Sequence, residues 1–332
     1  MNDLGWAIVV LIVLGLLTFL AKWLIADISA KWSRNLIHVG MGCVSLGFPF
    51  MSLDRLTVLY LGLLIMTALL MLRFTKLRKI FGSILLGTSR KSFGEFYFVI
   101  AVVIVYLVYN EVYEYLISIA VLTFAQCSTS LIRLSDRRFS IPPTKEEEKS
   151  NEGSFMFFIV AYFCTLIPLQ LMSEIGRAEV LVVSFLIGVL AALIKMVSVN
   201  GNDNFLLAIL TFAFLRHNIY QSLTDIFIGL GMMLLLIISF ILIYKLTSIT
   251  KLSVVYSLFA AYIILIQGGY TWLIPAGLLF IMFGILPFIS KEERQLMHNY
   301  RVVECNAIVG ISCLVISIFV PEYILRNENR NY

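Results

Sequence analysis

The sequence predicts an all-α protein, a polytopic transmembrane bundle of about twelve helices. Its 332 residues are 60% hydrophobic and only 14% charged, and the mean hydropathy is +0.95. A soluble domain covers its surface with polar side chains, whereas helices in a bilayer expose Leu, Ile, Val and Phe to lipid. The apolar residues also gather into runs of roughly 20, the length that a helix needs to cross the hydrocarbon core.

The predicted spans follow one another with short polar segments between them, at 4–25, 35–53, 56–73, 95–110, 112–132, 155–173, 178–198, 205–220, 223–244, 252–268, 271–290 and 303–321. The run at 205–220 is short and ends in Arg216-His217-Asn218, so it could be tilted or re-entrant. We expect two parts: a membrane domain at 1–240 and an appended transmembrane helical unit at 241–332.

The distribution of Lys and Arg predicts the orientation, because cytoplasmic loops of membrane proteins are enriched in these residues. With twelve spans, 20 of the 25 Lys and Arg residues lie in the odd-numbered loops. We therefore expect a multi-pass integral membrane protein, in the cell membrane if the source is bacterial, with the odd-numbered loops in the cytoplasm and both termini outside. The net charge of +5 does not indicate a nucleic-acid partner, because the basic residues fall between apolar runs.

Two of the expected cytoplasmic loops are long. The loop at 74–94 contains an apolar stretch, 80–86, that could lie along the membrane interface as a short amphipathic helix. The loop at 133–154 is the most polar part of the chain, and Pro142-Pro143 prevents a helix there. Long polar loops in compact proteins usually carry function.

The end of the second loop, Lys149-Ser150-Asn-Glu152-Gly153-Ser154, runs straight into an apolar helix. It could be a solvated charged loop with Ser150 as the helix N-cap. It could also be a phosphate site, because backbone N–H groups and the dipole at a helix start attract anions. In that case Lys149 supplies a counter-charge, and Glu152 could hold a divalent cation beside the phosphates.

Three further polar groups open or close apolar runs on the same predicted face. Asp203-Asn204 could cap a helix or supply oxygen ligands to Mg²⁺. Arg34 and His38 lie one helical turn apart and could contact a phosphate or a lipid hydroxyl, or serve as interface residues. Glu95 enters an apolar segment, where a carboxylate without a partner is costly. Together these groups describe an anionic, water-soluble co-substrate that meets a lipid at the membrane interface.

The motif residues occur in a fixed order along the chain: Arg34-x-x-x-His38, Gly94-Glu95-x-Tyr97-Phe98, Arg137-Arg138-Phe139, Lys149-Ser150-x-Glu152-Gly153-Ser154-x-x-Phe157-Phe158 and Asp203-Asn204. This set resembles the phytol kinase and dolichol kinase family, which is related to the phosphatidate cytidylyltransferases. Members of that family are integral membrane enzymes that use CTP to phosphorylate a long isoprenoid alcohol. The resemblance covers roughly residues 30–240, and its most specific element is the stretch at 149–158.

The resemblance implies a role for each motif residue in phosphoryl transfer from CTP to the alcohol. Glu95 or His38 would orient the alcohol, and Arg137 and Arg138 would neutralise developing charge. The residues expected at the nucleotide and its Mg²⁺ ion are Arg34, Lys149, Ser150, Gly153, Ser154 and Asn204 for the nucleotide, and Glu152 and Asp203 for the metal.

Several positions depart from the family pattern. The aspartate expected in the span before Arg137 is replaced by Gln126 or Thr129, depending on the alignment, and the glutamate expected before Asp203 is Lys195. In addition, Asn35 stands in place of a lysine and Asp136 in place of a glycine. Loss of two carboxylates weakens a Mg²⁺-nucleotide site, so an inactive family member is an alternative to the kinase.

A transporter or flippase for a lipid-linked or anionic substrate is a further alternative, because Gln126, Ser128, Thr129 and Ser130 could form a polar pathway. The segment 251–310 faintly resembles the membrane family that includes phytyl-phosphate kinases, through Gly268-Gly269-x-x-Trp272-x-x-Pro275 and Arg301 followed by Asn306. We infer no second activity from it.

Overall fold

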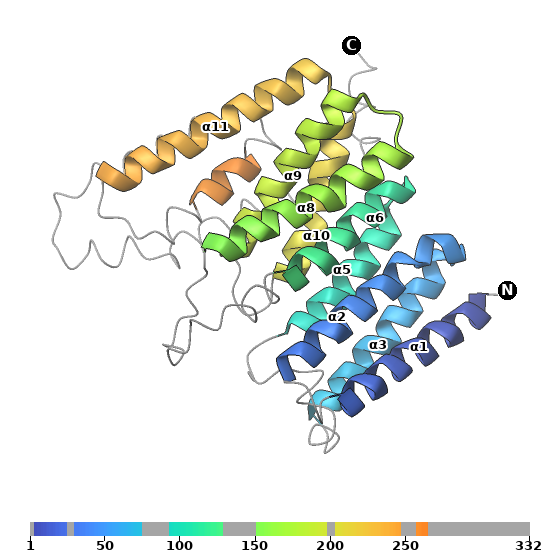
Figure 1. The fold of residues 1–332 in the computed structure, drawn as a ribbon. Coiled ribbons are helices and arrows are strands. Elements are labelled where there is room, and N and C mark those ends of the chain that lie inside the picture. The colour runs from blue at the N-terminus through green and yellow to red at the C-terminus, as the bar shows by residue number, and fades with distance from the viewer. Residues whose placement is uncertain are drawn as a thin grey trace, which may run out of the picture. The chain divides into compact units, whose positions relative to one another are not determined.

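The computed structural model describes residues 3–24, 30–74, 93–128, 151–197, 203–246 and 257–264, and within these ranges every regular element is helical (Figure 1). The elements are α1 (Asp3–Leu24), α2 (Ala30–Leu46), η1 (Phe48–Met51), α3 (Arg55–Phe74), α5 (Gly94–Val108), α6 (Val112–Ala120), η2 (Val121–Ala125), α8 (Asn151–Met172), α9 (Arg177–Val197), α10 (Asp203–Ile219) and α11 (Leu223–Leu246). The all-α prediction is confirmed for this part of the chain. The predicted spans at 271–290 and 303–321 and the interfacial stretch at 80–86 lie outside the described residues.

Four of the described helices are long and apolar enough to cross a membrane: Asp3–Leu20, Arg55–Arg73, Gly153–Met172 and Arg177–Met196. The outer face of α1 shows why. Leu4, Ile8, Ile12, Leu16 and Leu20 recur every fourth residue and are all exposed. Side chains four residues apart lie on one face of a helix, so α1 presents a continuous apolar stripe. Exposure of such a stripe to water is unfavourable, whereas contact with lipid is not.

The second predicted span is shorter in the structure than in the sequence prediction. The apolar run at 35–53 was expected to form one helix, but α2 ends at Leu46, and the short 3₁₀ helix η1 follows a turn at Gly47. Pro49 accounts for the break, because it lacks the N–H that would continue the helical hydrogen bonding. Ser52 then takes a left-handed conformation, with φ of 49°, that turns the chain into α3.

The chain divides into two compact units, Met1–Arg216 and His217–Tyr332. The boundary that the sequence suggested after residue 240 would fall inside α11, which runs without interruption from Leu223 to Leu246. The first unit holds the candidate site and the cavity described below. In it, α8 packs on α9, α3 on α5, and α1 on α2.

Helices α5 and α10 of the first unit run in the same direction and are joined at both ends. At their starts, Asn204 Nδ2 donates to the Gly94 carbonyl oxygen at 2.8 Å. At the other end, Arg216 donates to the Val108 carbonyl oxygen at 3.5 Å. Since α5 has 15 residues, its two ends lie about 22 Å apart. Polar contacts near Gly94 and near Val108 therefore belong to opposite ends of the helices.

Candidate functional site

Three side chains from three helices bond to one another at the Gly94 end. Lys195 Nζ lies 2.8 Å from Asp203 Oδ2 and 2.9 Å from Gln126 Oε1. Gln126 Nε2 donates to the same Asp203 Oδ2 at 2.9 Å. Each of the three side chains therefore bonds to the other two. We call Gln126, Lys195 and Asp203 the polar triad.

The helix ends explain why the triad forms there. Lys195 lies in the last turn of α9, Asp203 is the first residue of α10, and Gln126 follows η2 directly. The dipole of a helix favours a cation at its C-terminus and an anion at its N-terminus, and both charges satisfy that preference. The five-residue segment 198–202 between the two helices is short enough to keep the two ends together.

Asp203 is a buried carboxylate held in its charged form. Its burial acts to raise its pKa, but the positive charge of Lys195 and the hydrogen bonds from Lys195 and Gln126 act in the opposite direction and prevail. His38 adds a smaller effect of the same sign. The pKa of Asp203 is therefore lowered from its ordinary value of 3.8, and the carboxylate is ionised at neutral pH.

A π-helical segment brings His38 to the same end of the helices. Residues of η2 form wider turns than an α-helix, and such segments are frequent at functional sites. Gly42 of α2 lies against Thr123 of η2 so closely that an added methyl group would overlap the threonine side chain. This close approach lets His38 Nε2 donate to the Leu122 carbonyl oxygen at 3.3 Å.

The starts of α5 and α10 meet beside the triad. Asn204 is 7% exposed, and its amide nitrogen makes the bond to Gly94 described above. Its side-chain oxygen, Oδ1, has no hydrogen-bond partner among the described residues. Glu95 is half-buried in the first turn of α5, where a negative charge is favourable.

Helix α8 also begins near the triad. The fully buried ring of Phe157 has its centroid 5.8 Å from Lys195 Nζ, within the range of a cation–π contact. Gly153 and Ser154 lie in the first turn of α8, because the helix begins at Asn151 rather than after the expected Gly-Ser turn. The stretch that the sequence predicts to bind phosphate is thus helical from residue 151, with Gly153 and Ser154 at the helix N-terminus.

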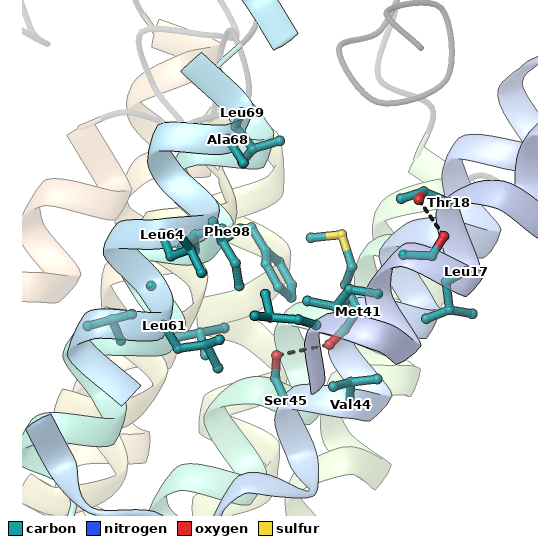
Figure 2. Close-up of a pocket in the computed structure, with 18 of the residues that line it drawn as sticks. Leu17, Thr18, Met41, Val44, Ser45, Leu61, Leu64, Ala68, Leu69 and Phe98 are labelled. Carbon is teal, nitrogen blue, oxygen red and sulfur yellow. Dashed lines mark hydrogen bonds between the residues drawn. The ribbon is translucent and has the colours of Figure 1, made fainter. Parts of the chain in front are cut away.

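An apolar cavity of about 320 Å³ lies between α1, α2, α3 and α5 (Figure 2). Only two of its lining side chains, Thr18 and Ser45, carry hydroxyl groups. Thr18 donates to the Gly15 carbonyl oxygen at 2.8 Å and Ser45 to the Met41 carbonyl oxygen at 2.9 Å, each within its own helix. The cavity wall is therefore suited to hydrocarbon rather than to a polar ligand.

Phe98 connects the cavity to the polar end of the helices. Its ring lines the cavity and meets the ring of His38 edge to face, with a centroid distance of 5.0 Å. His38 in turn contacts Leu122, four residues before Gln126. His38 thus lies behind the part of the cavity wall that Phe98 forms, and does not itself line the cavity.

The structure brings together only part of the predicted site. Six of the predicted site residues lie at the Gly94 end of the first unit: His38, Glu95, Gly153, Ser154, Asp203 and Asn204. Four others lie outside the described residues: Arg137, Arg138, Lys149 and Ser150. For Arg34 and Glu152 only the backbone is described. The roles of these six residues stay predictions.

Two members of the triad were not predicted as site residues. The sequence marks Gln126 and Lys195 as departures from a family pattern, inside the predicted spans 112–132 and 178–198, and Gln126 also as part of a possible polar pathway. Their position inside apolar runs is the available signal, because a polar group there needs a partner. Among the described residues, no group of three or more His, Cys, Asp and Glu could hold a metal ion. The carboxylate of Asp203, expected at Mg²⁺, is instead bonded to Lys195 and Gln126.

Comparison with known proteins adds no relative: no protein-family model, curated protein or solved structure matches the chain.

Proposed function

We propose that this chain is a multi-pass membrane enzyme that transfers a phosphoryl group from CTP to the hydroxyl of a membrane isoprenoid alcohol, at the cytoplasmic face. One observation carries the proposal. The apolar cavity and the polar triad are connected through Phe98 and His38, so an apolar chain and a polar head group would each find a suitable environment in one unit. The motif order of the sequence supplies the reaction type.

The cavity supports an isoprenoid tail rather than a polar substrate. Its two hydroxyl groups are occupied within their own helices, and its other lining side chains are hydrocarbon, glycine or the thioether of Met41. A hydrocarbon chain gains about 0.8 kcal/mol for each buried CH₂ group when it leaves water, but little when it leaves lipid. Recognition of the alcohol therefore depends on shape and on the polar groups at the end of the chain.

The groups at the polar end suit phosphoryl transfer. In its neutral form, His38 would take the proton of the alcohol as the alcohol oxygen attacks the γ-phosphorus, while the bond from that phosphorus to the β,γ-bridging oxygen breaks. The products are the phosphorylated alcohol and CDP. The start of α8, where the nucleotide phosphates are expected, would supply backbone N–H groups and the positive end of the helix dipole. Because such a reaction depends mainly on positioning and electrostatics, few groups are required.

Mg²⁺ does not fit the polar triad, because the Asp203 carboxylate is already paired with an ammonium group. We therefore assign no step to a metal ion held by these three residues. Glu152, the other expected ligand, has no described side chain.

A second candidate is a lipid-binding protein without catalytic activity. The Lys195–Asp203 ion pair favours it, because the chain has lost carboxylates at two positions where the kinase pattern has them. The transporter alternative has less support. Gln126 is bonded within the triad and Ser128 donates to the Ala125 carbonyl oxygen, while Thr129 and Ser130 lie outside the described residues.

The test is phosphorylation by the purified full-length chain in lipid nanodiscs, with γ-labelled CTP or ATP and a panel of isoprenoid alcohols. We expect labelled lipid from wild type with CTP and a loss of label in His38→Ala. Thr67→Val is the matched control, because the hydroxyl of Thr67 donates to the Leu64 carbonyl oxygen within α3 and Thr67 does not line the cavity. Absence of labelled lipid with every alcohol and both nucleotides would contradict the kinase. Saturable retention of an isoprenoid alcohol by that same preparation would then support the non-catalytic alternative.

A further inference from the structure

We propose that the ammonium group of Lys195 takes the place of a divalent cation in the polar triad, so that Gln126, Lys195 and Asp203 bind no metal ion. Asp203 Oδ2 accepts from both Lys195 Nζ and Gln126 Nε2, at 2.8 and 2.9 Å. Lys195 Nζ also donates to Gln126 Oε1 at 2.9 Å. The positive charge that contacts Asp203 Oδ2 and Gln126 Oε1 is therefore the side chain of Lys195 itself. The inference concerns this cation alone and does not depend on the reaction proposed above.

The charges of the triad leave no attraction for a metal ion. One carboxylate and one ammonium sum to zero, and the Gln126 amide is neutral. Mg²⁺ binds through one or two carboxylates together with substrate phosphates, at 2.0–2.1 Å from each oxygen. An ion at that distance from Asp203 Oδ2 would compete directly with Nζ for the same oxygen, and the two positive charges would repel each other.

Three features hold Lys195 in this position. It lies in the last turn of α9, where a helix favours a cation, and Asp203 opens α10, where a helix favours an anion. The ring of Phe157 lies 5.8 Å from Nζ and contributes a cation–π contact. Asp203 is only 7% exposed, so loss of the ammonium would leave a buried carboxylate without its counter-charge. The arrangement is specific to a resident ammonium group.

The test measures binding of Mn²⁺, without nucleotide, to full-length protein in detergent by electron paramagnetic resonance, with thermal unfolding as a second readout. Three proteins are compared: wild type, Asp203→Asn, and the double variant Gln126→Glu/Lys195→Gln, which exchanges the ammonium for an amide and adds a carboxylate. We expect no Mn²⁺ binding in wild type that is sensitive to Asp203→Asn. We expect the double variant to bind Mn²⁺ roughly tenfold or more tightly than wild type, with a higher unfolding temperature in its presence, because two carboxylates then face one another.

Saturable Mn²⁺ binding by wild type that disappears in Asp203→Asn would overturn the proposal, since Asp203 would then be a metal ligand beside Lys195. A folded double variant that binds Mn²⁺ no better than wild type would also overturn it, because the Lys195 position would not be a cation position. If the double variant does not fold, the comparison of wild type with Asp203→Asn decides, because it needs no change at Lys195.

Discussion

Lys195 Nζ lies 2.8 Å from Asp203 Oδ2, and the two residues close a segment of only seven intervening positions between the end of α9 and the start of α10. This pair links the two helices at the polar end of the first unit. Gln126 adds the chain segment after η2 to the same contact. Three segments thus meet at a single carboxylate, and changes at these residues should affect folding as well as ligand binding.

Removal of the ammonium group should destabilise the protein strongly. We expect Lys195→Met to lower the free energy of unfolding by about 3 kcal/mol, because it leaves the carboxylate of Asp203 buried and unpaired. The double variant Lys195→Met/Asp203→Asn should recover a large part of this loss, since it removes both charges. Unfolding in a mixed-micelle titration gives the two free energies. Equal losses in the single and double variants would show that packing of the lysine stem, not the ion pair, is responsible.

The loss of folding stability at low pH should depend on Asp203. Its pKa is lowered in the folded chain, so the contribution of Asp203 to stability is complete above the ordinary value of 3.8 and is lost as the pH falls through the lower folded value. Thermal unfolding of wild type should therefore show a loss of stability below about pH 4 that is smaller in Asp203→Asn. In Lys195→Met the two largest effects that lower the pKa are lost, while the hydrogen bond from Gln126 and the effect of His38 remain. The pKa of Asp203 should therefore rise from its wild-type value, and the loss of stability below about pH 4 should become smaller. An unchanged pH profile in both variants would contradict this assignment.

The close approach of α2 to η2 predicts a contrast between two glycines. Gly42→Ala should destabilise the protein by about 1–3 kcal/mol, because the new methyl group overlaps the Thr123 side chain. Gly15→Ala is the matched control, since a methyl group there meets nothing within 4 Å and alanine favours the helix. Gly42→Ala should also weaken the contact of His38 with Leu122, which the nitrogen chemical shifts of a labelled His38 would report. Equal stability of the two variants would show that α2 shifts at no cost.

Filling the apolar cavity should prevent binding of a hydrocarbon chain without disturbing the triad. Gly15 lines the cavity and has open space around it, so Gly15→Leu places a side chain in the cavity without a backbone clash. We expect reduced labelling by a photoreactive isoprenoid alcohol and an unchanged unfolding temperature. Gly229→Leu, at another glycine with open space that is not among the residues lining the cavity, should label as wild type does. Undiminished labelling of Gly15→Leu would exclude the cavity as the tail site.

The sequence predicted helices well because each depends on a local pattern. The run at 56–73, for example, corresponds closely to α3, Arg55–Phe74, since length and hydropathy suffice to find it. The early end of α2 was missed although Gly47 and Pro49 were visible, because the surrounding residues are apolar enough to pass for a span. The π-helical turns of η2 depend on packing against Gly42, and no local pattern indicates them.

The site was harder to predict because its contacts join distant parts of the chain. Asp203 was chosen as a metal ligand from its residue type and position, but its actual partners are 8 and 77 residues away. A lysine at the end of an apolar run gives no indication of which carboxylate it will meet. The departures at Gln126 and Lys195 were each visible alone, and only the fold shows that they occupy one site.

Helix α1 forms one wall of the cavity with Leu11, Leu14 and Leu17, and Leu17 is labelled in Figure 2. Its other face is the exposed apolar stripe described above. A hydrophobic compound that partitions into the bilayer would therefore reach the cavity sideways, past a single helix, without passing through water. For such a compound the relevant dose is its mole fraction among the surrounding lipids, not its molarity in the buffer. Adding more phospholipid at a constant amount of compound should then lower occupancy by surface dilution, even though the total concentration is unchanged.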